Sequence, residues 1–173
     1  MTTPAERPLT VVLVGPMAAG KTSIGRRVAR GLGVAFIDTD KRIAAAHGPI
    51  PALFADRGEA YFRELEREAV AQALQEGGVV SLGGGAVTDA GTRELLAQHP
   101  VVFLTVSAEA VAGRIRGGGR PLLAGDDPVA RWTEIFAARK DWYAQVADRT
   151  IDTSRRPMGR IAEEIVAWRR ALG

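Results

Sequence analysis

Eight residues near the start of the chain constrain its fold more than any others: Gly15-Pro16-Met17-Ala18-Ala19-Gly20-Lys21-Thr22. They fit the pattern Gly-x-x-x-x-Gly-Lys-Ser/Thr at every fixed position. The apolar run 10–14 predicts a buried strand before them, and Ser23 begins a helical pattern. Backbone N–H groups of such a loop cradle phosphate oxygens, and the following helix N-terminus adds positive field. Lys21 is then expected to reach the β- and γ-phosphates and Thr22 to hold Mg²⁺, which predicts a nucleoside triphosphate site.

The rest of the chain alternates between short apolar runs and helical patterns. Strands are predicted at 10–14, 34–37, 78–82, 100–105 and 149–152, and helices at about 20–31, 57–76, 89–97, 107–116, 127–147 and 158–171. This alternation favours one α/β domain over 1–173, a parallel sheet covered by helices. Ligands should gather at the carboxyl ends of its strands.

Composition excludes several classes of function. The chain has 173 residues and no cysteine, so it has no disulfide or thiolate metal site, and it has no apolar run long enough to span a bilayer. The segment 1–8 is short and polar, unlike a secretory signal. The net charge is +3, with arginines scattered among acids, so we expect no nucleic-acid partner. A cytoplasmic monomer is the expectation.

Two carboxylates follow the second predicted strand, in Asp38-Thr39-Asp40. Residues two apart share a face only while a strand stays regular, and regularity lapses at a strand end. The two acids can therefore serve different ligands, one Mg²⁺ and the other a substrate hydroxyl. The alternative is that one of them caps a helix starting near Lys41.

The third predicted strand ends in Ser81-Leu82-Gly83-Gly84-Gly85. Three glycines permit close approach of a ligand to the backbone, although a flexible turn is the alternative. This strand lacks the acid that often supports Mg²⁺ in phosphate-loop proteins, so Asp38 is the candidate for that role.

Arginines suited to anions occur in three further places. Arg120 lies in the glycine-flanked segment 117–127, which has the pattern of a mobile lid or else of a plain surface loop. Arg63 and Arg139 lie on predicted helices, where each is either a surface residue or a bidentate partner for a carboxylate or phosphate.

Taken in order, five motifs resemble shikimate kinase: the Gly-x-x-x-x-Gly-Lys-Thr loop, Phe36-Ile37-Asp38-Thr39-Asp40, Phe62-Arg63-Glu64-Leu65-Glu66, Ser81-Leu82-Gly83-Gly84-Gly85-Ala86-Val87 and Arg120-Pro121-Leu122-Leu123. The likeness runs from about Leu9 to Arg170. It implies a nucleoside-monophosphate-kinase-like three-layer fold with strand order 2-3-1-4-5 and a lid at about 114–126. It also implies the reaction, transfer of the γ-phosphate of MgATP to the 3-hydroxyl of shikimate.

The resemblance also assigns roles to single residues. It makes Lys21, Asp40 and Arg120 catalytic, and gives the metal to Thr22 and Asp38. It places ATP at the phosphate loop with Ser23, Arg114, Arg120, Arg156 and Pro157. It places shikimate in the region of about 38–66, where the residues predicted to bind it are joined by others from later in the chain: Asp40, Phe54, Phe62, Arg63, Gly83, Gly84, Gly85, Arg120, Leu122 and Arg139.

Other functions stay open on the sequence. A related kinase could phosphorylate gluconate or a nucleoside monophosphate, and a regulatory or nucleic-acid-binding module could reuse the fold. A GTPase is disfavoured because the chain contains no asparagine, which the usual guanine-reading motif requires.

Overall fold

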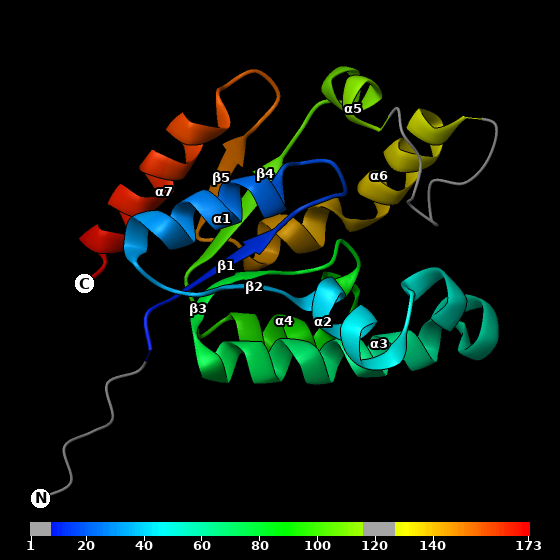
Figure 1. Cartoon of the computed structure of the whole chain (residues 1–173). Helices are drawn as coiled ribbons and strands as arrows, with labels where there is room; N and C mark the ends of the chain where they lie inside the picture. Colours follow the sequence, from blue (N-terminus) through cyan, green and yellow to red (C-terminus); the bar gives the residue numbers. More distant parts are fainter. Residues whose placement is uncertain (1–7, 116–126) are drawn as a thin grey trace, which may run out of the picture.

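Five parallel strands form one sheet in the computed structural model, which describes residues 8–115 and 127–173 (Figure 1). The sheet order is β2-β3-β1-β4-β5, as the resemblance to shikimate kinase implies. The strands are β1 (Thr10–Val14), β2 (Phe36–Asp38), β3 (Gly78–Ser81), β4 (Val101–Thr105) and β5 (Arg149–Asp152). Their runs of valine, isoleucine and leucine are typical of strands that are buried on both faces.

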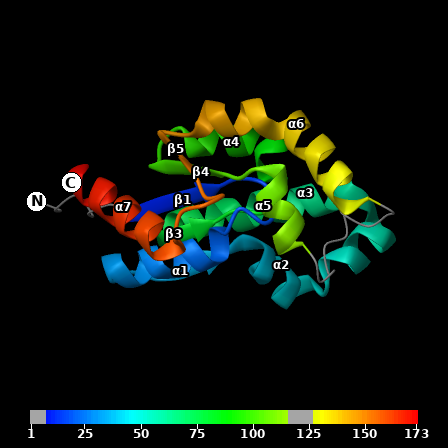
Figure 2. The same ribbon diagram turned by 90° about the horizontal axis from the view of Figure 1, so that it is seen from above.

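Helices cover both faces of this sheet. They are α1 (Lys21–Leu32), α2 (Thr39–His47), α3 (Ile50–Glu76), α4 (Ala90–Leu96), α5 (Ala108–Arg114), α6 (Pro128–Val146) and α7 (Met158–Ala171), with a 3₁₀ turn η1 at Ala86–Thr88. One core packs α1 and α7 on the sheet, and the other packs α3, α4 and α6 on its opposite face (Figure 2). Among the described helices, none is both long and apolar enough to cross a bilayer.

The segment after β2 differs from the prediction. The sequence predicts a helix from about residue 57 and gives one near Lys41 only as an alternative, whereas α2 and the first turns of α3 occupy 39–47 and 50–57. Gly48, with a φ of 95°, ends α2, and Pro51 is tolerated in the first turn of α3. Gly58 breaks the helical path of α3 with a φ of 82°. The Gly-Pro stretch is therefore a short break between helices rather than a long irregular segment.

Register brings the carboxyl ends of the central strands together. Asp38 of β2 and Leu13 of β1 each pair with Ser81 of β3, and Val14 pairs with Phe103 of β4. Gly15 follows β1 directly, and a Cβ built there would overlap the backbone carbonyl of Leu104. A glycine is therefore required at the point where the chain leaves the sheet and enters the phosphate loop.

Candidate active site

The phosphate loop leads from β1 into α1. Gly20 is the N-cap of α1 in a left-handed conformation, with a φ of 94°, and no side chain caps the helix. The first turn of α1 contains no acidic residue, so its positive field is left for a ligand. The Lys21 ammonium donates to the carbonyls of Gly15 at 2.7 Å and Pro16 at 2.9 Å. The lysine is therefore folded back over the loop, beside the position where phosphates are predicted.

Three side chains from outside the loop bind three successive loop carbonyls. The Trp132 indole donates to the carbonyl of Met17 at 2.8 Å, and Thr153 donates to that of Ala19 at 2.7 Å. Between them, the Arg114 guanidinium donates to the carbonyl of Ala18 at 2.9 Å. Trp132 and Thr153 were not predicted as site residues, because nothing in their local sequence links them to a loop more than 100 positions away.

Arg114 was predicted to contact ATP. In the structure, its guanidinium supports the backbone of the phosphate loop. Its guanidinium also donates to the Thr153 carbonyl at 2.7 Å, which ties the end of α5 to the segment after β5. Ala18, whose carbonyl it binds, has a φ of 66°, a conformation that costs free energy for a residue with a Cβ. The hydrogen bonds from Arg114 help to hold the loop in this shape.

Asp38 and Asp40 separate because the chain turns from strand to helix between them. Asp38 ends β2 and caps α2, where its Oδ1 accepts from the Lys41 amide at 3.1 Å. Its Oδ2 lies 3.4 Å from the Thr22 hydroxyl, so the capping role and a place beside the phosphate loop coexist. Asp40 lies in the first turn of α2 and its Oδ1 is buried without a hydrogen bond. Burial, followed by the nearby charge of Asp38, raises the Asp40 pKa above its usual value.

Steric constraints explain why glycines occur at positions 83 and 85 of the triple glycine. A Cβ at Gly83 would overlap the Asp40 carboxylate, and one at Gly85 would overlap the Arg63 guanidinium. None of the three glycines requires a left-handed backbone. Gly83 and Gly85 are needed for the space that they leave to charged side chains, which the sequence reasoning did not identify, whereas a Cβ at Gly84 would come no nearer than 3.6 Å to another atom.

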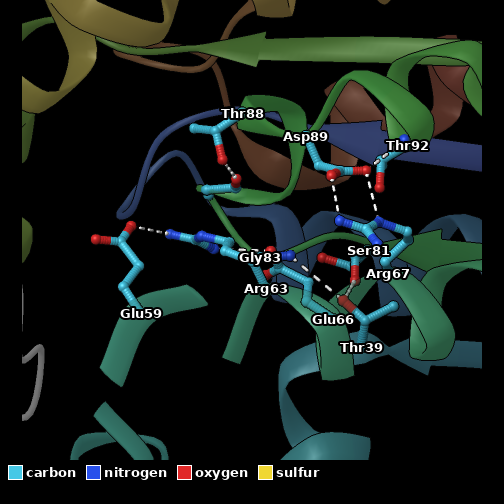
Figure 3. A network of polar contacts seen from close by, with 12 residues as sticks. Thr39, Glu59, Arg63, Glu66, Arg67, Ser81, Gly83, Thr88, Asp89 and Thr92 are labelled. Carbon is cyan, nitrogen blue, oxygen red and sulfur yellow. Dashed lines mark hydrogen bonds and ion pairs between the residues drawn. The ribbon is translucent and has the colours of Figure 1, made fainter. Parts of the chain in front are cut away.

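Arg63 lies on α3 in a network of polar contacts that Figure 3 shows. It donates to Glu66 at 2.7 Å and to Glu59 at 3.2 Å. Glu66 is 2% exposed, and burial raises the pKa of its carboxyl to about 7 although Arg63 lowers it. The Arg63 Nε and the Glu66 Oε2 are buried with no hydrogen-bond partner among the described residues. Buried polar atoms of native proteins are usually paired, so these two atoms, with the Asp40 Oδ1, mark a place for a polar ligand.

Glu66 was not among the predicted site residues, although it ends the Phe-Arg-x-x-Glu motif. Its spacing of three residues from Arg63 places both side chains on one helix face, which is the signal that could have found it. On the same helix, Arg67 donates two hydrogen bonds to the Asp89 carboxylate, at 2.7 and 3.0 Å. Asp89 also caps α4 by accepting from Thr92 (Figure 3). This pair joins α3 to the segment that follows the triple glycine.

The raised pKa of Glu66 leads to a pH-dependence prediction. The folded protein holds the Glu66 proton up to a pH of about 7, whereas the unfolded chain releases it near 4.5. Between these values the folded state binds more protons, so this contribution to stability falls as the pH rises. Subtracting the unfolding free energy of Glu66→Gln from that of the wild type should give a difference that decreases over this window. Urea titrations across the window measure it, with the exposed Glu68→Gln as control. A difference that increases with pH contradicts the prediction.

Arg139 and two phenylalanines complete this end of the site. Arg139 projects from α6, is 9% exposed, and lies against Gly84. Phe54 and Phe62, both on α3, have ring centroids 4.8 Å apart. Arg139 was predicted to lie on a helix after the lid, and the structure brings it to the same cavity as Arg63.

A cavity of about 680 Å³ joins these groups. It collects most of the predicted residues from six parts of the chain. Its lining consists of Met17, Ala18, Gly20, Lys21, Thr22, Ser23, Asp38, Asp40, Lys41, Ala44, Ile50, Pro51, Phe54, Phe62, Arg63, Glu66, Ser81, Leu82, Gly83, Gly84, Gly85, Arg114, Arg139 and Met158.

Some predicted residues are not in this lining. Gly15, Pro16 and Ala19 belong to the loop but do not line the cavity. Arg156 forms an ion pair with Glu164 at 2.6 Å, and the neighbouring Pro157 is the N-cap residue of α7. Their contact with ATP stays a prediction. Arg120 and Leu122 lie outside the described residues.

Comparison with known proteins gives a consistent result. The sequence matches the shikimate kinase family over residues 17–170. It is 47% identical to a shikimate kinase of Mycobacterium avium over 161 residues, which cover 90% of each chain. The structure resembles that of shikimate kinase from Acinetobacter baumannii in complex with shikimate, with a TM-score of 0.88, 35% identity and 96% of each chain covered.

A more distant likeness concerns the fold alone. A gluconokinase from Sinorhizobium meliloti has a TM-score of 0.66 at 20% identity, covering 96% of this chain and 94% of that one. The family match, which spans nearly all of the described sequence, distinguishes between these two kinds of kinase. By that match, and by its close identity to curated relatives over most of its length, this chain belongs to the shikimate kinase family.

Proposed function

We propose that this chain carries out the reaction of its family, transfer of the γ-phosphate of ATP to the 3-hydroxyl of shikimate, in the cavity described above. This proposal rests on one observation, the different polar groups that stand at the two ends of the cavity. One end is the phosphate loop, and the other holds three buried polar atoms, on Asp40, Arg63 and Glu66, that have no hydrogen-bond partner within the described part of the chain. A polyhydroxylated carboxylic acid supplies donors and acceptors for all three.

The ATP phosphates occupy the loop and the N-terminus of α1. Lys21 leaves the carbonyls of Gly15 and Pro16, which it now contacts, and binds the β- and γ-phosphates. Phosphoryl transfer passes through a loose transition state in which positioning and charge neutralisation supply most of the catalysis. The loop amides and Lys21 therefore have the main catalytic role among the described residues.

Thr22 and Asp38 fit a magnesium ion. A hydroxyl and a carboxylate oxygen 3.4 Å apart beside a phosphate loop are hard oxygen ligands of the kind that Mg²⁺ takes, usually completed by phosphates and water. When bound there, the ion neutralises charge that develops on the phosphates.

Shikimate binds at the opposite end. Arg63 and Arg139 come from two different helices and hold its carboxylate, and Phe54 with Phe62 contacts the apolar side of its ring. Asp40 accepts from a ring hydroxyl and so orients it toward the γ-phosphate. A loose transition state needs little help from a base, so orientation is the role that we assign to Asp40.

We assign acceptor binding and closure over ATP to two different regions of the chain. Residues of about 38–66 form the acceptor-binding region, and the segment of about 114–126 closes over ATP as a lid. Arg120 contacts the phosphates from that lid, and Leu122 contacts the acceptor. Apart from Arg114 and Ile115, the lid falls outside the described residues.

A parallel assay tests this function. ADP release is measured with MgATP and either shikimate, gluconate or AMP as acceptor. We expect turnover with shikimate that exceeds the other two by orders of magnitude. Gluconate is the most informative competitor, because it also offers a carboxylate to the two arginines. Faster turnover with gluconate or AMP than with shikimate, or none with any acceptor, rejects the proposal.

Changing Asp38 or Asp40 to asparagine should impair the reaction in two different ways. Asp38→Asn should raise the Mg²⁺ concentration needed for half-maximal rate, because a charged oxygen beside Thr22 is lost. Asparagine caps helices as well as aspartate does, so α2 should persist. Asp40→Asn should instead raise the KM for shikimate or lower kcat at unchanged Mg²⁺ demand. Magnesium titrations of both variants provide the measurement, and identical metal profiles would contradict the assignment.

A further inference from the structure

We propose that helix α6 is a positioning element that holds the two halves of the active site in register: Trp132 fixes the phosphate loop and Tyr143 fixes the acceptor pocket. This inference rests on the proposed function. Neither residue lines the cavity, so each acts through a group that does.

The sequence of α6 places both residues on one face of the helix. Trp132, Phe136, Arg139 and Tyr143 follow one another at intervals of four, three and four residues, the spacing that aligns side chains on a helix. At 1.5 Å per residue, the two ends of this face are about 16 Å apart along the axis. A helix is stiff over this length, so it can hold the two segments bound along this face in fixed positions relative to each other.

The Trp132 end holds the phosphate loop. Trp132 is 3% exposed, and its indole N–H donates to the Met17 carbonyl at 2.8 Å. Its ring stacks on Phe136 with centroids 5.2 Å apart, which fixes the direction of the N–H. Met17 lies on the cavity wall at the nucleotide end.

The Tyr143 end holds the acceptor pocket. Tyr143 is 1% exposed, and its hydroxyl donates to the carbonyl of Gly84, the middle residue of the triple glycine. Burial raises the pKa of Tyr143 to about 12, although the nearby charge of Arg139 lowers it. The hydroxyl therefore stays protonated over the working pH range and keeps its hydrogen bond to Gly84, beside the arginine that we propose binds the carboxylate.

The sheet anchors the middle of this face. Phe103 on β4 stacks against Tyr143 with centroids 5.2 Å apart and also contacts Phe136 at 6.4 Å. Phe103 pairs in register with Val14, the last residue before the phosphate loop. The helix is thereby held against the strand next to β1. Its two polar residues hold the phosphate loop and the triple glycine where these two segments meet, since a Cβ at Gly84 would lie 3.7 Å from the Met17 nitrogen.

Two substitutions that each remove one polar group test this role. Tyr143→Phe keeps the ring and removes the hydroxyl. We expect the KM and the Kd for shikimate to rise about tenfold, as for one lost buried hydrogen bond, with little change in the KM for ATP. Trp132→Phe removes the N–H at the other end and should raise the KM and the Kd for ATP by a similar factor, leaving the shikimate values nearly unchanged.

Matched controls come from the same chain. Trp168 on α7 packs against the core without a hydrogen bond in the described structure, and the ring of Tyr61 on α3 lies against the Arg57 cation. Trp168→Phe and Tyr61→Phe should leave both KM values unchanged. Circular dichroism and thermal melting establish that every variant is folded at the assay temperature. If Trp132→Phe does not fold, Trp132→Met, whose flexible apolar side chain also lacks the N–H, takes its place.

The selectivity of the two effects decides the proposal. A general loss of packing raises both KM values together in either variant, and such a result, or no change in either, overturns it. Failure of the proposed function is distinguishable, because wild-type turnover with shikimate is measured first. If the wild type prefers another acceptor, the same selectivity is tested with that acceptor.

Discussion

Lys21→Met should nearly abolish turnover while the protein stays folded. The expected loss is about 3–5 kcal/mol of transition-state stabilisation, over a hundred- to several thousandfold in kcat. The reason is the position of the ammonium, which contacts the carbonyls of Gly15 and Pro16 at the mouth of the phosphate loop. Methionine fills similar space without charge. The measurement is kcat at saturating MgATP and shikimate, from a coupled ADP assay.

Lys140→Met is the matched control, because Lys140 is exposed on α6 and lies outside the cavity lining. It should retain normal kcat. The melting temperature of Lys21→Met without nucleotide should differ little from that of the wild type, since Lys21 lies at the surface of the cavity rather than in either core. If Lys21→Met keeps a tenth of the normal kcat, the assignment of the phosphate loop is wrong.

Arg139→Lys should raise the KM for shikimate about ten- to over a hundredfold, the range for one charge-assisted contact of about 1.5–3 kcal/mol. A guanidinium binds a carboxylate through two parallel hydrogen bonds, whereas an ammonium is a single point of contact on a shorter side chain. Arg139 is buried and reaches the cavity beside Gly84, so water cannot easily replace the lost contact. ATP binding should change much less. Steady-state kinetics with each substrate varied provides the comparison.

A shikimate analogue without the carboxylate separates this role from others. The effect of Arg139→Lys should largely vanish with the analogue, because the partner of the guanidinium is then already absent. Arg131→Lys, a change to an exposed arginine paired with Glu134 on the same helix, controls for the substitution itself. An equal penalty for shikimate and its analogue would show that Arg139 does not bind the carboxylate.

The strands and the phosphate loop could be predicted because their signals are local. β1 and the loop after it are contiguous in sequence, and the period of the apolar residues indicates a buried strand whatever lies beside it. A parallel sheet then places every strand's carboxyl end at one edge. The cavity accordingly contains Asp38, Asp40 and Gly83, all of which follow predicted strands.

Helix α2 was predicted only as an alternative, and the first turns of α3 were missed, for a related local reason. The glycine and prolines at 48–51 read as one irregular region, yet each stands at a helix end where its backbone preference fits. The packing of Ile43 against Leu53 and Phe62 then stabilises both short helical segments. Such contacts between neighbouring helices do not appear in a helix pattern read one segment at a time.

Local sequence patterns were enough to predict the phosphate-binding loop, the alternation of strands and helices, and the charged residues available for chemistry. How those charges are supported depends on contacts that form only in the folded chain. Trp132 meets Met17 across 115 positions, Thr153 meets Ala19 across 134, and Tyr143 meets Gly84 across 59. The same holds for the glycines at 83 and 85, whose missing side chains leave room for Asp40 and Arg63. Local patterns report the backbone preferences of neighbouring residues, whereas these contacts depend on the packing of helices against both faces of a completed sheet.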